Sequence, residues 1–181
     1  RGLGDVYKRQ QLVALQGNHE IMMLDAFRDT YAKDAWESVG GKQTLTSYWA
    51  RGLSGSLDDI PESHRKLLRF QLLPYFQTDT HFFVHANAYH EVPLDQQPDY
   101  MLYWEKWNRP PRHMSGKIMV CGHSSLRDGR PASNGDSICI DTAVYRDSGW
   151  LTCLDVESGE YWQANEAAEF RGGWISDLEE S

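Results

Sequence analysis

Three apolar runs in this chain each end in a short polar sequence that carries an asparagine or a histidine. The runs 12–15, 82–84 and 118–121 lead into Gly17-Asn18-His19-Glu20, His85-Ala86-Asn87 and Gly122-His123-Ser124, respectively. Short continuous apolar runs predict buried strands. Core packing alone does not explain an asparagine or histidine after each of three strands. The pattern therefore indicates a sheet with functional side chains at its strand ends.

The remaining periodicity predicts helices before the middle of the chain and strands after it. We expect helices over about 20–32, through Leu45 and Trp49, and from about 59 to Pro74, where Pro61 lies in the first turn. The expected strands are 81–84, 118–121, 137–140, 150–155 and 161–163, with hairpin turns near 147–149 and 157–160. This order predicts an α/β or α+β layered fold with mixed sheets. The Pro- and aromatic-rich segment 91–112 is expected to form a lid or rim.

Charge and cysteine content exclude several classes of protein. The formal charge is −8, from 18 Lys plus Arg against 26 Asp plus Glu, which disfavours nucleic-acid binding. No apolar run approaches the roughly 20 residues that span a bilayer, and no secretion signal is recognisable. The three cysteines, Cys121, Cys139 and Cys153, lack the spacing of a disulfide framework and indicate reduced thiols in the cytoplasm. We interpret Cys121 as a small buried residue rather than a zinc ligand.

The residues at the three strand ends suit metal-dependent hydrolysis. Asn18, His85 and His123 are suitable ligands for a divalent ion such as Mn, Fe, Zn or Ni. Two such ions about 3.5–4 Å apart neutralise a phosphoryl group and supply a nucleophile at neutral pH. His19 follows the first ligand and is placed to protonate the leaving oxygen. The helix start after Glu20 adds amide donors for an anion.

At these residues the chain resembles the calcineurin-like metallophosphoesterases, most closely the bacterial serine/threonine phosphoprotein phosphatase branch. The resemblance covers about Leu12 to Gln163 and includes, besides the three motifs in order, Ile140-Asp141-Thr142 and Trp150-Leu151-Thr152. It implies a mixed β-sheet sandwich flanked by helices. It further implies that Asn18, His85 and His123 bind one metal of a dinuclear centre, and that His19 is the general acid.

Two further motifs of that family should precede Gly17: an Asp-x-His pair and a Gly-Asp-x-x-Asp-Arg-Gly loop. The segment 4–10 imitates the second motif but has Lys8 where the loop needs an aspartate, and too few residues follow it to hold a helix and a strand before Asn18. We therefore expect residues 1–10 to be extraneous and the sequence to be truncated. Residues 11–165 would form a partial domain that lacks its first strands, and residues 166–181 an acidic, loosely ordered tail.

Other residues have weaker assignments. Lys106 stands near the place where relatives have a phosphate-binding arginine. Either Lys106 or, alternatively, Arg112 is expected to bind the substrate phosphate. Glu20 and Asp141 are expected to contact and orient the ligands without binding the metal themselves. Each candidate ligand could instead have a purely structural role. Asn18 could cap a helix, His85 could be a core residue, and His123 could be a turn residue.

The predicted activity is hydrolysis of phosphoesters, with a phosphoprotein or a small phosphoester as substrate. A dinucleoside polyphosphate hydrolase shares the same motifs and is the alternative enzyme. A second alternative is a catalytically incompetent half-site that binds metal weakly, because the ligands of the missing motifs are absent. The third alternative is a β-rich structural or sugar-binding domain in which the histidines are incidental.

Overall fold

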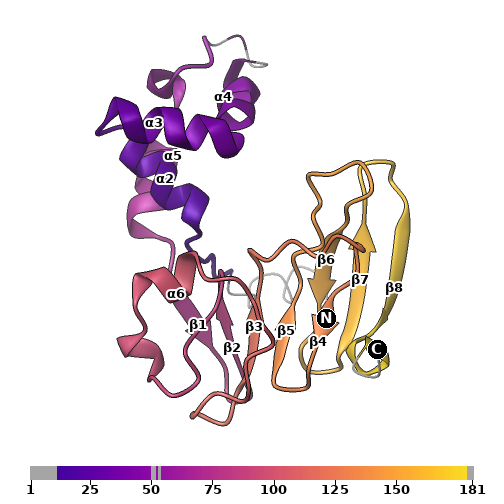
Figure 1. Cartoon of the computed structure of the whole chain (residues 1–181). Helices are drawn as coiled ribbons and strands as arrows, with labels where there is room; N and C mark the ends of the chain where they lie inside the picture. Colours follow the sequence, from indigo (N-terminus) through magenta and orange to yellow (C-terminus); the bar gives the residue numbers. More distant parts are fainter. Residues whose placement is uncertain (1–11, 50–51, 53, 179–181) are drawn as a thin grey trace, which may run out of the picture. The chain divides into compact units, whose positions relative to one another are not determined.

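The structure, a computed structural model, describes residues 12–49, 52 and 54–178. The chain divides into two compact units, Arg1–Leu73 and Pro74–Ser181. The described part of the first unit is helical, and the second unit contains a five-stranded mixed sheet and a three-stranded sheet (Figure 1). This confirms the predicted mixed α/β class. The segment 1–10, predicted to be extraneous, lies outside the described residues.

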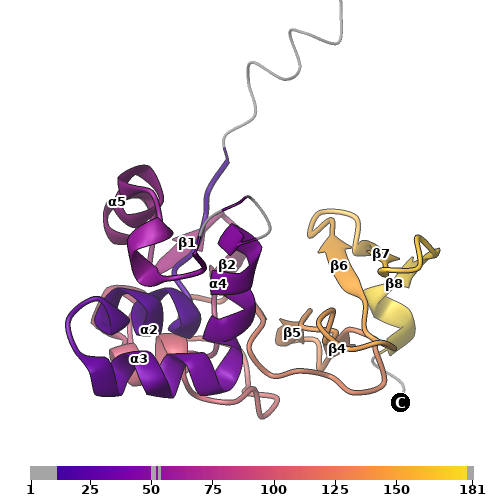
Figure 2. The same cartoon turned by 90° about the horizontal axis from the view of Figure 1, so that it is seen from above.

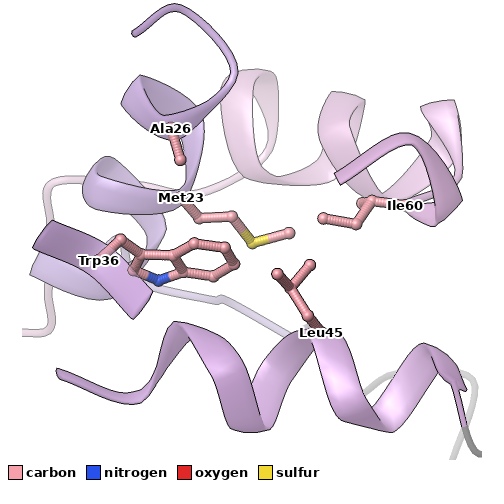
Figure 3. Close-up of a cluster of buried hydrophobic side chains, with 5 residues drawn as sticks. All are labelled: Met23, Ala26, Trp36, Leu45 and Ile60. Carbon is pink, nitrogen blue, oxygen red and sulfur yellow. The ribbon is translucent and has the colours of Figure 1, made fainter. Parts of the chain in front are cut away.

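The first unit is built from short helices around one apolar cluster. The helical elements are α2 (Asn18–Ala26), α3 (Thr30–Trp36), η1 (Glu37–Gly41), α4 (Lys42–Trp49), η2 (Leu57–Asp59) and α5 (Glu62–Phe70). The buried cluster consists of Met23, Ala26, Trp36, Leu45 and Ile60 (Figure 3). These side chains come from α2, α3, α4 and the turn before α5, so one cluster ties together the helices of this unit. No helix in the described part of the chain is long and apolar enough to cross a membrane.

Two sequence predictions for the first unit were wrong in detail. The single helix predicted over 20–32 is two helices, because the Asp29 carboxylate accepts hydrogen bonds from the backbone N–H groups of Tyr31 and Ala32 and starts α3. The run 12–15 is not a full strand. Within the described residues it makes one parallel bridge, between Leu15 and Leu73, and Leu12 is 94% exposed.

The second unit begins with a mixed sheet whose central strands are parallel. Its strands are β1 (Tyr75–Gln77), β2 (His81–Val84), β3 (Ile118–Cys121), β4 (Ala132–Ser133) and β5 (Ser137–Cys139). They are ordered β1-β2-β3-β5-β4, with β2, β3 and β5 parallel and the two outer strands antiparallel. The predicted strands 81–84 and 118–121 are confirmed with the same bounds. The long β2–β3 connection holds η3 (Leu94–Gln96) and α6 (Asp99–Tyr103).

The second sheet is an antiparallel meander that packs on the first. It consists of β6 (Leu151–Leu154), β7 (Glu160–Ala164) and β8 (Phe170–Trp174), followed by η4 (Ile175–Leu178). The core between the sheets contains Val120 and Ile138 from the first sheet, Tyr161 from β7, and Ile175 from η4. Figure 2 shows β6 and β7 alongside β4 and β5.

The end of the chain differs from the expectation of a loosely ordered tail over 166–181. Residues 170–174 form β8, paired along its whole length with β7, and Ile175 is 5% exposed. The sequence did not predict this strand because Gly172 and Gly173 interrupt the alternation of side chains by which a strand is recognised. Both glycines lie against Tyr161, where an added Cβ would come within 2.7 Å of the Tyr161 carbonyl oxygen or 2.8 Å of its hydroxyl.

The burial of His81 on β2 predicts a pH dependence of stability. His81 is 6% exposed, and burial, with a smaller contribution from the Arg112 charge, lowers the pKa of its imidazole. The unfolded state therefore binds this proton more readily, so the stability that the neutral ring provides is present above about pH 6.5 and is lost as the pH falls through the folded pKa. We expect urea denaturation between pH 7.5 and 5, values that bracket the reference pKa of about 6.5, to show a decline that is smaller in His81→Gln. An equal decline in both proteins would contradict this assignment.

Candidate metal centre

Two histidines far apart in the sequence meet at the carboxyl ends of neighbouring parallel strands. His85 follows β2, His123 follows β3 after Gly122, and the strands pair in parallel register with Phe83 opposite Val120. The Gly122 N–H donates to the His85 carbonyl over 2.9 Å, which extends the pairing past the strand ends. The two rings lie with centroids 5.0 Å apart, and His85 Nε2 is 3.2 Å from His123 Nδ1. The predicted convergence of His85 and His123 is thus present within one unit.

A hydrogen bond at Nε2 of His123 determines which ring nitrogen carries a proton. His123 Nε2 lies 3.1 Å from the carbonyl oxygen of Trp104. A carbonyl only accepts hydrogen bonds, so Nε2 carries a proton, and in the neutral ring Nδ1 directs its lone pair toward His85 Nε2. A histidine that binds a metal commonly donates its other N–H to a backbone carbonyl in this way.

The backbone at His123 is in an uncommon conformation that several contacts stabilise. Its φ is +59°, in the left-handed region that a β-carbon disfavours. The Lys106 ammonium donates to the His123 carbonyl over 2.8 Å, and the Ser124 hydroxyl accepts the Trp107 N–H over 2.6 Å. Such strain persists only where surrounding contacts over-determine it, and it concentrates at functional sites.

The segment after α6 therefore lies against the histidine turn. Besides the contacts of Trp104, Lys106 and Trp107, the Asn87 amide donates to the Lys106 carbonyl over 2.8 Å. This part of the predicted rim 91–112 connects the residues after His85 with the turn at His123. Lys106, predicted to bind substrate, makes a backbone contact that positions His123.

Asp141 and Cys139 contact the same turn from the β5 side, where the Cys139 thiol lies 3.5 Å from the Ser124 carbonyl oxygen. The Asp141 carboxylate accepts from the Ser125 hydroxyl over 3.3 Å, and its carbonyl accepts the Leu126 N–H. Cys121 and Cys139 are register partners on β3 and β5, and both are buried. Burial raises the pKa of the Cys121 thiol well above its ordinary range. The prediction that Cys121 is a small buried residue is confirmed.

The first motif lies at the start of α2 in the first unit. Gly17 is the N-cap residue, and its N–H donates to the Glu20 carboxylate over 2.8 Å, so Glu20 is part of the helix cap. Asn18 is the first helical residue and is 8% exposed, so the cap position considered for it belongs to Gly17. His19 is exposed, and a Cβ on Gly40 would lie 3.5 Å from its Cε1.

Two arginines have places that the sequence did not indicate. Arg112, the alternative substrate-binding residue, forms an ion pair of 2.7 Å with Asp136 and also donates to the Gly135 carbonyl, so its guanidinium holds a turn. Arg109 instead lines a cavity of about 380 Å³, to which Asn87 also contributes. The Arg109 guanidinium lies 5.6 Å from the centroid of the Trp107 ring. The feature of the sequence that could have drawn attention to Arg109 is its position two residues after Trp107.

In the part of the chain that the structure describes, no group of three or more His, Cys, Asp or Glu side chains is arranged to hold a metal ion. The histidine pair is the core of the candidate site. Asparagine is not among these residue types, and Asn18, the amide ligand that the sequence predicts, lies on α2 of the first unit. No protein-family model, curated protein or solved structure matches the chain.

Proposed function

We propose that this chain carries part of the active site of a metal-dependent phosphoester hydrolase of the calcineurin-like type, with phosphoserine or phosphothreonine proteins as its favoured substrates. The observation that supports the proposal best is the histidine pair at the ends of β2 and β3, with ring nitrogens 3.2 Å apart. The choice of phosphoprotein substrates rests on the sequence resemblance.

The donor set fits a divalent ion. Two nitrogens bound to one zinc-like ion at about 2.0–2.1 Å, with roughly 90–110° between the bonds, lie about 2.9–3.4 Å apart. The observed separation of His85 Nε2 and His123 Nδ1 is 3.2 Å, which agrees with this range. The His123 Nε2–H donates to the Trp104 carbonyl, so Nδ1, which contacts His85 Nε2 in this structure, is the nitrogen that would bind the ion.

In this proposal each residue has one role. His85 and His123 bind the ion directly, and Lys106 and Asp141 hold the turn that carries His123. Asn18 is assigned as a third ligand and His19 as the general acid by resemblance, and both lie on α2 of the first unit. When bound, the divalent ions supply charge neutralisation and an activated water.

Metal-dependent stabilisation tests the proposal. A ligand that binds only the native state adds about 2.7 kcal/mol at 100 times its Kd. Excess Mn²⁺ or Zn²⁺ is therefore expected to raise the melting temperature of the protein, and His85→Ala or His123→Ala is expected to remove that rise. His90→Ala, a histidine of the same unit whose ring pairs with the Glu91 carboxylate, is the matched control and should keep it. No metal-induced rise, or an equal rise in all variants, would contradict the proposed site.

Turnover distinguishes the enzymatic alternatives. With Mn²⁺ present, a serine/threonine phosphatase is expected to release phosphate from a phosphopeptide faster than it cleaves diadenosine tetraphosphate. The opposite order would favour a dinucleoside polyphosphate hydrolase. Metal binding at the pair without turnover of either substrate would identify the chain as the half-site.

A further inference from the structure

The outward side of the three-stranded sheet in the second unit carries a row of large exposed apolar side chains. Pairing places Cys153 opposite Trp162, and Ala164 opposite both Leu151 and Phe170. Side chains alternate along a strand, so these residues and Trp174 share one side of the sheet. We call this side the outer sheet face. Its members are Leu151, Cys153, Trp162, Ala164, Phe170 and Trp174, together with Gly172 and, at one end opposite Trp174, Glu160.

The opposite side of the same sheet is the one that packs. Leu154 and Tyr161 contribute to the core between the two sheets. The Gln163 amide donates to the Gly129 carbonyl and to the Thr152 hydroxyl, and Gln163 is 2% exposed. Along β7, Tyr161 and Gln163 are buried while Trp162 between them is exposed. Among the described residues, the core cluster of this unit includes no member of the outer sheet face.

The outer sheet face exposes an apolar area comparable to the largest patch on a typical monomer. Its four large side chains remain exposed by 62% at Leu151, 46% at Trp162, 80% at Phe170 and 48% at Trp174. Since an aromatic side chain presents about 150–250 Å², these four together expose on the order of 400–500 Å². The largest apolar patch on a typical monomer covers about 300–600 Å² and is often functional.

Acidic hairpins border this face at both ends. One border holds Asp155, Glu157 and Glu160, and the other holds Glu166 and Glu169. Arg171 is the only basic residue from 150 to 178, and its guanidinium lies on the packed side, 4.0 Å from the Trp150 ring centroid and bonded to Gln163. The negative charge around the outer sheet face is thus not compensated within the sheet.

We propose that the outer sheet face binds a cationic amphipathic segment of a partner protein. Aliphatic or aromatic side chains of that segment pack on Trp162, Phe170 and Trp174, while its lysines and arginines approach the acidic hairpins. Cations are also attracted to the faces of exposed tryptophans. The exposed area suits a peptide segment, because a stable dimer buries about 800 Å² per partner. A second copy of this chain would bring like charges together, and nucleic acid is repelled for the same reason.

Cys153 provides a direct test, since it lies on this face opposite Trp162 and is the exposed thiol of the three cysteines. The probe is a short synthetic peptide that alternates leucine or tryptophan with lysine, and its control has glutamate in place of lysine. The lysine peptide is expected to slow alkylation of Cys153 by iodoacetamide in a saturable manner, to about a tenth at ten times Kd. Roughly 1 M salt, with a Debye length of about 3 Å, should weaken this protection.

Variants distinguish the face from general stickiness. Phe170→Gln removes an exposed side chain and should reduce protection, whereas Tyr100→Gln, 55% exposed on α6 of the same unit, should not. Glu166→Gln with Glu169→Gln should weaken binding and reduce its salt dependence. The proposal is overturned if neither peptide protects Cys153, if the glutamate peptide protects equally, or if sedimentation shows a dimer whose formation shields Cys153 and is lost in Phe170→Gln.

Discussion

Replacing His19 with alanine is expected to lower kcat for a phosphoserine peptide by about 10²–10⁴-fold, the range that a positioned general acid contributes. The corresponding loss of transition-state stabilisation is about 3–5 kcal/mol. His19 is exposed at the start of α2, and Gly40, with φ of +130°, lies beside its ring and leaves space that a side chain would fill. The prediction applies to a form of the protein that turns over phosphoesters with Mn²⁺.

The leaving group distinguishes an acid from a merely structural residue. An alkoxide needs a proton as it departs, whereas p-nitrophenolate is stable without one. His19→Ala should therefore affect the phosphoserine peptide strongly and p-nitrophenyl phosphate weakly, with metal-induced stabilisation unchanged. His64→Ala, an exposed histidine of the same unit that contacts the Tyr48 hydroxyl, is the matched control and should keep normal rates. An equal loss on both substrates would show that His19 is not the acid.

The strands that carry the histidine pair were predictable because they are buried on both sides. β2 and β3 form continuous apolar runs, a pattern typical of parallel strands in the middle of a sheet, and both match the predicted bounds. The polar residue after each run was therefore placed at a strand end from the sequence alone. That His85 and His123 are neighbours depends on the parallel pairing of β2 with β3, which periodicity along a single chain does not specify.

The elements that were missed depend on tertiary contacts. β1 is three residues long, and β8 contains two glycines, so neither has a clear local pattern. Conversely, the run 12–15 has a strand pattern but makes only one bridge, at Leu15. A strand forms only where a partner completes its hydrogen bonds, and a pattern of side chains does not show whether a partner is present.

The supporting contacts of the site were the least predictable part. Lys106 donates to a backbone carbonyl, and Arg112 forms an ion pair with Asp136, because long basic side chains reach whatever acceptor the fold brings near. The Trp104 carbonyl, which sets the tautomer of His123, is a backbone group and has no sequence signal at all. Residue type thus pointed to His85 and His123 as candidate metal ligands, while the contacts that orient the two rings required the structure.

Replacing Trp36 with alanine is expected to destabilise the first unit by about 3–5 kcal/mol, the usual cost of truncating a large buried aromatic side chain. Trp36 is 1% exposed and belongs to the cluster with Met23 and Leu45 (Figure 3). Its ring also abuts Gly41, where an added Cβ would lie 2.5 Å from Cδ2, so neighbouring atoms are already in close contact. This loss is a large fraction of the stability of an ordinary domain.

Because Met23 lies on the helix that begins with Asn18 and His19, loosening the cluster should also loosen that helix. Backbone amides of α2 are therefore expected to exchange with solvent faster in Trp36→Ala, and urea denaturation should show the lower stability. Trp49→Ala is the matched control: Trp49 is 65% exposed in the same unit, and its loss should change stability by no more than about 0.5 kcal/mol. Equal effects of the two tryptophan variants would contradict the view that the Trp36 cluster holds α2 in place.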